Sequence, residues 1–115
     1  MTLTGIEKRR HKRIDCEIQS AIKTTDENGR PSLLETTVQD ISEGGVRFRI
    51  NKFIPVRDRV WVKLNIPRSK PIEVLTKPAW IRELPSIGQY DIGAQFLTLT
   101  DEDRRLIQSF VGVTA

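Results

Sequence analysis

Residues 40–50 read Asp-Ile-Ser-Glu-Gly-Gly-Val-Arg-Phe-Arg-Ile. From Val46 onward, apolar residues alternate with arginines, so that every second side chain can face a core while the others face water. Such a period of two predicts a half-buried β-strand. The preceding pair Gly44-Gly45 predicts a tight turn or a bulge, because glycine accepts backbone conformations that are barred to other residues. The stretch therefore predicts two consecutive strands joined by a turn at residues 42–45.

The same alternation recurs on both sides of this turn and is clearest at residues 60–66, Val-Trp-Val-Lys-Leu-Asn-Ile. Asn28-Gly29 predicts a hairpin turn, because both residues tolerate a positive φ. Pro78 interrupts a later run and predicts an edge strand or a bulge, because proline cannot donate a hydrogen bond to a neighbouring strand. The predicted strands cover residues 13–22, 33–40, 46–50, 60–66, 72–84 and 90–96.

Beyond residue 100 the period changes to that of a helix. Thr100 predicts an N-cap, and residues 101–103 are acidic, which the positive end of a helix dipole favours. Short antiparallel strands followed by one amphipathic helix predict an all-β barrel or sandwich, with a C-terminal α-helix packed on the sheet. The apolar residues that recur at helical spacing are Leu106, Ile107, Phe110 and Val111.

Length and composition indicate one domain. The chain has 115 residues, of which 37% are hydrophobic, enough for one modest core. No run approaches the roughly 18–20 consecutive apolar residues that span a bilayer, and the first residues lack the pattern of a secretory signal. The lone cysteine, Cys16, suits a reducing compartment. We therefore expect a cytoplasmic protein without a membrane span.

Basic residues gather near the N-terminus, although the net charge of the whole chain is a modest +4. Residues 8–13 read Lys-Arg-Arg-His-Lys-Arg, and such a cluster attracts polyanions. Residues 1–12 show no apolar periodicity, so we expect a flexible basic arm there in the free protein. A barrel domain should then occupy residues 13–115.

Recognisable patterns of catalytic or metal-binding residues are missing. With one histidine and one cysteine, the chain cannot assemble a Cys/His zinc site of the usual spacing. It has no glycine-rich phosphate loop. His11 lies in the predicted arm, where a catalytic base would lack a fixed geometry. We therefore expect a binding module rather than an enzyme, with no metal and no cofactor.

Two short motifs stand at strand boundaries. Arg9 and Arg13 form R-x-x-x-R immediately before the first predicted strand, and Asp40, Ser42 and Gly45 form D-x-S-x-x-G at the turn after the second. Together and in this order, they resemble the PilZ domain family of bacterial cyclic di-GMP receptors. The segments that also look like this family are residues 45–48, 78–82 and 92–96 and the helix from residue 100.

The resemblance implies a fold, a ligand and a set of contacts. The fold is a six- or seven-stranded antiparallel barrel with a C-terminal helix, and the ligand is cyclic di-GMP. Arg9 and Arg13 are expected to hold guanine and phosphate, and the adjacent Arg10 to touch phosphate or a second copy of the ligand. The second motif is expected to line the barrel surface that faces the ligand, through Asp40, Ser42 and Gly45.

The chemistry of these residue types agrees with that ligand. A guanidinium can donate two parallel hydrogen bonds to guanine O6 and N7 or to phosphate oxygens. The carboxylate of Asp40 suits the opposite guanine edge, where N1–H and the 2-amino group are donors, and adenine lacks that pair. We expect the arm to close over the barrel on binding and to create a surface for a downstream partner protein.

Several other interpretations remain open at this level. Asp40 and Ser42 can stabilise the turn without touching a ligand. Trp61 and Trp80 are interpreted as packing residues rather than stacking platforms. The fold can serve as a protein adaptor that binds no nucleotide, or as a barrel for another nucleotide or a flavin. A small nucleic-acid-binding barrel is a weaker alternative, because aromatic residues are few and only the arm is markedly basic.

Overall fold

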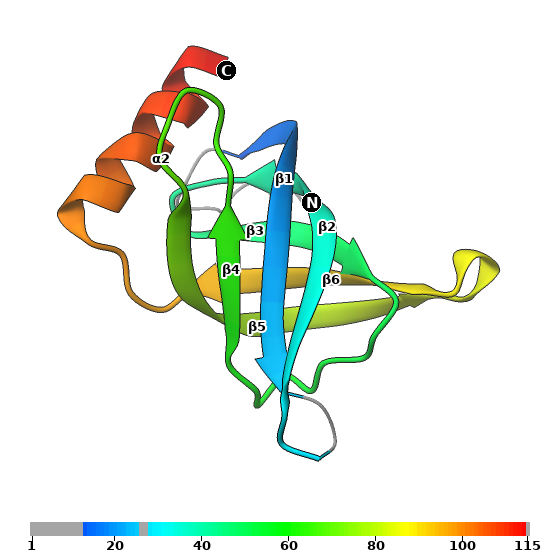
Figure 1. Ribbon diagram of the computed structural model, residues 1–115. Coiled ribbons are helices and arrows are strands. Elements are labelled where there is room, and N and C mark those ends of the chain that lie inside the picture. The colour runs from blue at the N-terminus through cyan, green and yellow to red at the C-terminus, as the bar shows by residue number, and fades with distance from the viewer. Residues whose placement is uncertain (1–12, 26–27, 115) are drawn as a thin grey trace, which may run out of the picture.

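The computed structural model describes residues 13–25 and 28–114. Within these residues, six antiparallel strands form one closed barrel, and one α-helix follows them (Figure 1). The all-β class and the barrel are thus confirmed, while the predicted arm over residues 1–12 lies outside the described residues. The elements are β1 (Ile14–Thr25), β2 (Pro31–Ile41), β3 (Gly45–Ile50), β4 (Val60–Leu64), β5 (Ile72–Leu84), the 3-10 turn η1 (Pro85–Ile87), β6 (Gln89–Phe96) and α2 (Asp101–Thr114).

The strands follow the order β1-β2-β3-β6-β5-β4 around the barrel, and β4 pairs back onto β1 to close it. Each strand in the described part of the chain therefore has two neighbours, so Pro78 does not lie on an edge strand. Instead, the register of β5 against β6 shifts between Pro78 and Trp80. The bulge that the sequence predicted as the alternative is confirmed, and it places one extra residue opposite Ala94 and Gly93.

The connection between β1 and β2 is longer than a two-residue hairpin turn. Pairing of the two strands ends at Thr25 and Pro31, so residues 26–30 join them. Gly29 has a φ of 79°, as a tight turn requires of glycine. Arg68, in the connection between β4 and β5, is a non-glycine residue that also has a positive φ, of 64°.

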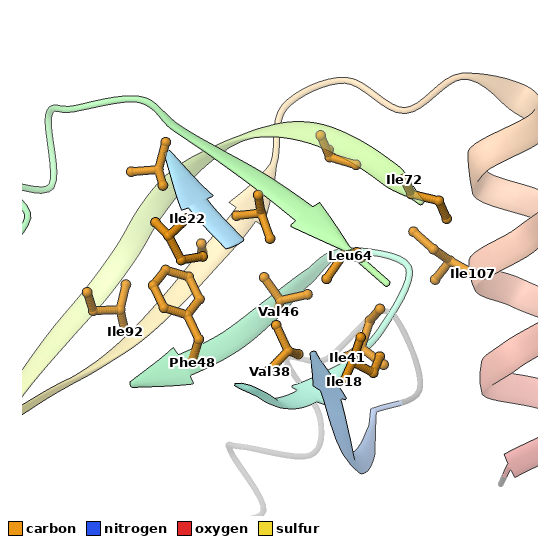
Figure 2. Close-up of a cluster of buried hydrophobic side chains, with 14 of the residues drawn as sticks. Ile18, Ile22, Val38, Ile41, Val46, Phe48, Leu64, Ile72, Ile92 and Ile107 are labelled. Carbon is orange, nitrogen blue, oxygen red and sulfur yellow. The ribbon is translucent and has the colours of Figure 1, made fainter. Parts of the chain in front are cut away.

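Alternating side chains from all six strands fill the barrel. Phe48 is fully buried near the centre, with Ile22, Val46 and Ile92 around it in Figure 2. Burying one such side chain contributes roughly 1.5–3 kcal/mol relative to leaving it exposed. The core is therefore held by the inward half of each alternating run, as the sequence predicted.

Helix α2 covers one end of the barrel. Ile107 is fully buried and points toward Leu64 and Ile72 in Figure 2. The hydroxyl of Thr100 accepts a hydrogen bond of 3.0 Å from the backbone N–H of Asp103, which confirms the predicted N-cap. In the described part of the chain, neither the length nor the apolar character of any helix is sufficient to cross a membrane.

Candidate ligand-binding site

The turn between β2 and β3 is held by its own hydrogen bonds. The backbone N–H of Ser42 donates to the carbonyl oxygen of Gly45 over 2.9 Å, and the N–H of Gly44 donates to the Ser42 hydroxyl oxygen over 3.0 Å. Ser42 therefore stabilises the turn, as the plainer interpretation held. Its hydroxyl proton remains able to donate, because the oxygen acts as the acceptor in the turn.

Gly45 is required by the close approach of a neighbouring strand. A Cβ at this position would overlap the carbonyl oxygen of Ala94 and would lie 3.1 Å from its carbonyl carbon. Both atoms belong to the backbone of β6, which pairs with β3 along its length. The glycine of the second motif thus has a structural reason that is independent of any ligand, and it brings β6 directly beside the motif turn.

On β6, Gly93 lies beneath the indole ring of Trp80. A Cβ at residue 93 would overlap the indole nitrogen and would lie 2.7 Å from Cζ2 of the ring. The bulge in β5 stands at this point of the β5–β6 pairing. Trp80 does pack, as the sequence interpretation held, but it packs on the outer face of the barrel and remains 38% exposed.

These features meet in one open pocket of about 240 Å³. Arg13 lines it from the residue before β1, and Ser42 and Gly45 line it from the motif turn. Trp80 and Gly93 complete it from β5 and β6. The tertiary structure therefore places the described arginine of the first motif beside two residues of the second, although about 30 positions separate them in the sequence.

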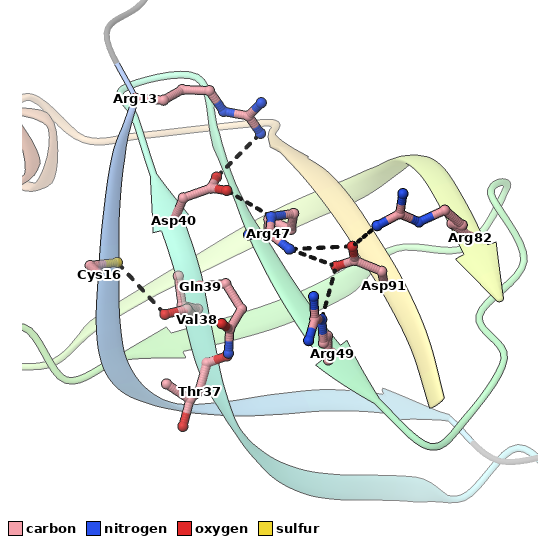
Figure 3. A network of polar contacts seen from close by, with 10 residues as sticks. All are labelled: Arg13, Cys16, Thr37, Val38, Gln39, Asp40, Arg47, Arg49, Arg82 and Asp91. Carbon is pink, nitrogen blue, oxygen red and sulfur yellow. Dashed lines mark hydrogen bonds and ion pairs between the residues drawn. The ribbon is translucent and has the colours of Figure 1, made fainter. Parts of the chain in front are cut away.

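Asp40 lies next to this pocket rather than among the residues that line it. Its Oδ1 is 3.3 Å from Nη2 of Arg13, and its Oδ2 accepts a hydrogen bond of 2.7 Å from Nε of Arg47 (Figure 3). The residue is 7% exposed. Among the described residues, no donor makes a hydrogen bond to Oδ1, so this buried oxygen keeps its capacity to accept.

Arg47 joins Asp40 to a second buried carboxylate. Its Nη1 donates to both oxygens of Asp91 over 3.2 Å, and Asp91 is fully buried. Nη2 of Arg82 adds a hydrogen bond of 2.9 Å to Asp91, and Nε of Arg49 lies 3.8 Å from it. The hydrogen bond to Asp40 raises the pKa of Arg47 above its already high usual value, so this guanidinium stays protonated.

The positive charge of this network exceeds its negative charge. Figure 3 shows four arginines around two carboxylates. Such a surplus beside an open pocket favours an anionic ligand. The four cations are Arg13, Arg47, Arg49 and Arg82.

The sequence prediction covered part of this site. Arg9 and Arg10 lie outside the described residues, so their predicted contacts stay predictions. Trp80 was not predicted at the site. Two features of the sequence could have pointed to it: a glycine within the last strand, Gly93, and a proline that interrupts the preceding strand, Pro78. Arg47 and Asp91 gave no signal at all. Charged residues at alternating strand positions are normally interpreted as solvent-facing.

A family model described as the PilZ domain matches residues 7–112. The chain belongs to the PilZ domain family. This PilZ domain has no match among the curated proteins. The match of the family model over residues 7–112 confirms the predicted family and spans nearly the whole chain.

Solved structures share the fold. The Bacillus subtilis inhibitor of motility MotI is 14% identical, with a TM-score of 0.78 over 93% of this chain and 51% of that one. The PilZ domain of Escherichia coli YcgR with c-di-GMP is 16% identical, with a TM-score of 0.68 over 92% and 90%. The K. pneumonia MrkH–c-di-GMP complex is 19% identical, with a TM-score of 0.71 over 93% and 52%. This PilZ domain thus spans about half the length of MotI and MrkH.

Proposed function

We propose that this PilZ domain is a receptor for cyclic di-GMP and acts by binding rather than by catalysis. One observation carries the proposal: a single open pocket is lined by Arg13 of the first motif and by Ser42 and Gly45 of the second. Two proteins of similar fold, YcgR and MrkH, are described in complex with c-di-GMP, which supports the same ligand class here.

Trp80 supplies a platform for one guanine. Its partly exposed indole ring lines the pocket, and stacking of a base on an aromatic side chain contributes about 1–3 kcal/mol. Arg13 lines the same pocket and can donate to guanine or phosphate. The accepting Oδ1 of Asp40 suits the N1–H and 2-amino donors of guanine once Arg13 engages the ligand.

The pocket is small for a whole dinucleotide. Its volume of about 240 Å³ is below the roughly 300–1,000 Å³ that usually holds a drug-sized ligand. We therefore place one guanine and its phosphate in the pocket and leave the other half of the ligand to Arg9 and Arg10. Fixing the backbone of each arm residue costs roughly 1–2 kcal/mol, which the arginine contacts must offset. The closed arm then creates a new surface for a partner protein.

The test is calorimetric titration of the protein with cyclic di-GMP, cyclic di-AMP, GTP and a short DNA duplex. We expect saturable binding of cyclic di-GMP alone, and the stoichiometry will count the bound copies. Arg13→Ala should weaken it ten-fold or more, because a good bidentate contact to guanine is worth about 1–3 kcal/mol. Arg59→Ala is the matched control, because Arg59 is exposed and lines a separate small pocket of about 150 Å³ near the end of β1.

Each alternative has its own outcome in this titration. Absence of heat with cyclic di-GMP would refute the receptor proposal and favour an adaptor that binds protein partners. Binding of DNA alone, with steep dependence on salt, would favour the nucleic-acid alternative. Equal affinities of the wild type and Arg13→Ala would refute the assignment of the pocket.

A further inference from the structure

Asp40 is a buried carboxylate with two unlike oxygens. Oδ2 accepts a short hydrogen bond from Arg47, whereas Oδ1 makes no hydrogen bond among the described residues and lies 3.3 Å from Nη2 of Arg13. A carboxylate that reads a guanine edge has to present its oxygens in one orientation, because both donors of that edge lie in the plane of the base. The side chain of aspartate can rotate, so some neighbour has to hold it.

Arg47 has the geometry to hold it. Its Nε donates to Asp40 over 2.7 Å while its Nη1 donates to both oxygens of Asp91 over 3.2 Å. The planar guanidinium thus spans two carboxylates that belong to different strands, β2 and β6. Lysine could not replace this arrangement, because an ammonium group is a point charge without a fixed fork of donors.

Asp91 holds the far end of the Arg47 guanidinium by accepting its hydrogen bonds. It is fully buried and also receives a hydrogen bond of 2.9 Å from Arg82. Neither Arg47 nor Asp91 is among the residues that line the pocket. An effect of either residue on the pocket therefore has to pass through Asp40, which lies beside the pocket.

We propose that Arg47 is a positioning residue for guanine recognition, which holds Oδ1 of Asp40 in place to accept from the ligand once Arg13 engages it, and is itself oriented by Asp91. This inference rests on the proposed function. It adds that selectivity for guanine depends on two residues that do not touch the ligand. Without the hydrogen bond from Arg47, the Asp40 carboxylate can rotate, and the discrimination between guanine and related bases falls.

The experiment compares two ligands that differ by one group. Cyclic di-IMP keeps N1–H, O6 and N7 of each base but lacks the 2-amino donor of cyclic di-GMP. We measure the affinity ratio of the two ligands by calorimetry for the wild type, Asp40→Asn, Arg47→Gln and the double variant. The wild type should prefer cyclic di-GMP about ten-fold or more, as expected when one partner of a buried polar contact is missing.

Arg47→Gln should lower this preference to near that of Asp40→Asn while changing the affinity for cyclic di-IMP less than three-fold. The double variant should show the same preference for cyclic di-GMP as the lower of the two single variants, because the effects of residues that act through one contact do not add. Arg82→Gln is the matched control: it also removes a hydrogen bond to Asp91, but Arg82 is 65% exposed and has no contact with Asp40. Arg82→Gln should keep the wild-type preference for cyclic di-GMP. It therefore measures how far a lost contact to Asp91 affects binding when Arg47 is intact.

The outcomes separate this inference from the receptor proposal. If the wild type does not bind cyclic di-GMP, both fail. If Asp40→Asn loses the preference and folded Arg47→Gln keeps it, only the positioning role is overturned. If Arg47→Gln does not fold, Asp91→Asn is measured in its place. This substitution keeps the shape of the side chain and weakens its hydrogen bonds with Arg47. That variant should lose part of the preference, and a wild-type preference would again overturn the inference.

Discussion

Two faces of the barrel each present an exposed tryptophan, and the two have different neighbours. Trp80 on β5 is 38% exposed and Trp61 on β4 is 43% exposed. Trp80 lies over the bare backbone of Gly93, beside the motif turn. Trp61 is instead flanked on its neighbouring strands by Lys23 and Leu75.

The size of a depression does not distinguish the two faces. The groove beside Trp61 has a volume of about 470 Å³, against about 240 Å³ for the pocket at Trp80. Charged residues of both signs line the larger groove, whereas the smaller pocket contains parts of both motifs. What marks the candidate site is therefore the set of chemical groups that converge there. The charged residues of the larger groove are Lys23, Glu35, Lys63 and Glu73.

The largest expected effect comes from adding one methyl group to the pocket face. Gly45→Ala places a Cβ against the backbone of Ala94, which cannot swing away as a side chain can. We expect a loss of stability at or above the upper end of the usual overpacking cost of about 1–3 kcal/mol. Thermal unfolding measures it. Gly112→Ala is the control, because nothing lies within 4 Å of that Cβ and alanine should stabilise the helix by about 0.5–1 kcal/mol. Equal melting temperatures for the two variants would contradict the structure.

Exchanging each tryptophan tests the comparison directly. Trp80→Ala should weaken binding of cyclic di-GMP by about ten-fold or more, because it removes a stacking contact of about 1–3 kcal/mol. Trp61→Ala should change the affinity less than two-fold, because Trp61 lies on the other face. Calorimetry on both folded variants decides, and similar losses in the two would show that the faces are not functionally distinct.

A smaller effect is expected from Gly93→Ala. The new Cβ would meet the indole of Trp80, a side chain that can rotate outward, so the barrel should keep most of its stability. The displaced ring should leave the pocket wall, and the affinity should fall by a few-fold, less than in Trp80→Ala. The emission of Trp80 should also shift to longer wavelength, measured in a Trp61→Phe background. Wild-type affinity together with unchanged emission would refute the contact.

The smallest effect reports on the charge beside the pocket. Burial, and next the charge of Asp40, raise the pKa of the Cys16 thiol to about 11. Since only the thiolate reacts, alkylation by iodoacetamide should be slow at pH 8 and should keep rising through pH 10. A small thiol in the same solution, with a pKa near its ordinary value of about 8.5, should instead level off by about pH 9.5. Asp40→Asn should bring the Cys16 profile toward lower pH, and an unchanged profile would argue against this coupling.

Much of the fold could be predicted from local patterns. The five residues from Val46 to Ile50 alternate, and β3 is found there. Thr100 caps α2 as its side chain suggested. The apolar alternation of the first strand ends at Ile22, whereas β1 continues to Thr25. Its last residues are polar and show no apolar alternation, but pairing with β2 keeps them extended.

The candidate site could be predicted less completely. Arg13, Ser42 and Gly45 were predicted at the site and do share one pocket, and Asp40 lies beside it. Asp91 was not predicted, because a charged residue between Tyr90 and Ile92 is expected to face water. It is buried because three arginines cover it from β3 and β5.

Most strands, the cap of the helix and the two motifs that indicated the PilZ family could be inferred from residue patterns along the chain. These depend on residue spacing along the chain, which is a local property. The tertiary structure alone decided that the barrel closes through β1 and β4, that Trp80 covers Gly93, and that Arg47 reaches Asp91 across 44 positions. Alternation reports which side chains face inward, but it does not report which strand lies next. Strand pairing is set by the packing of the whole core and by the bulges that close the barrel.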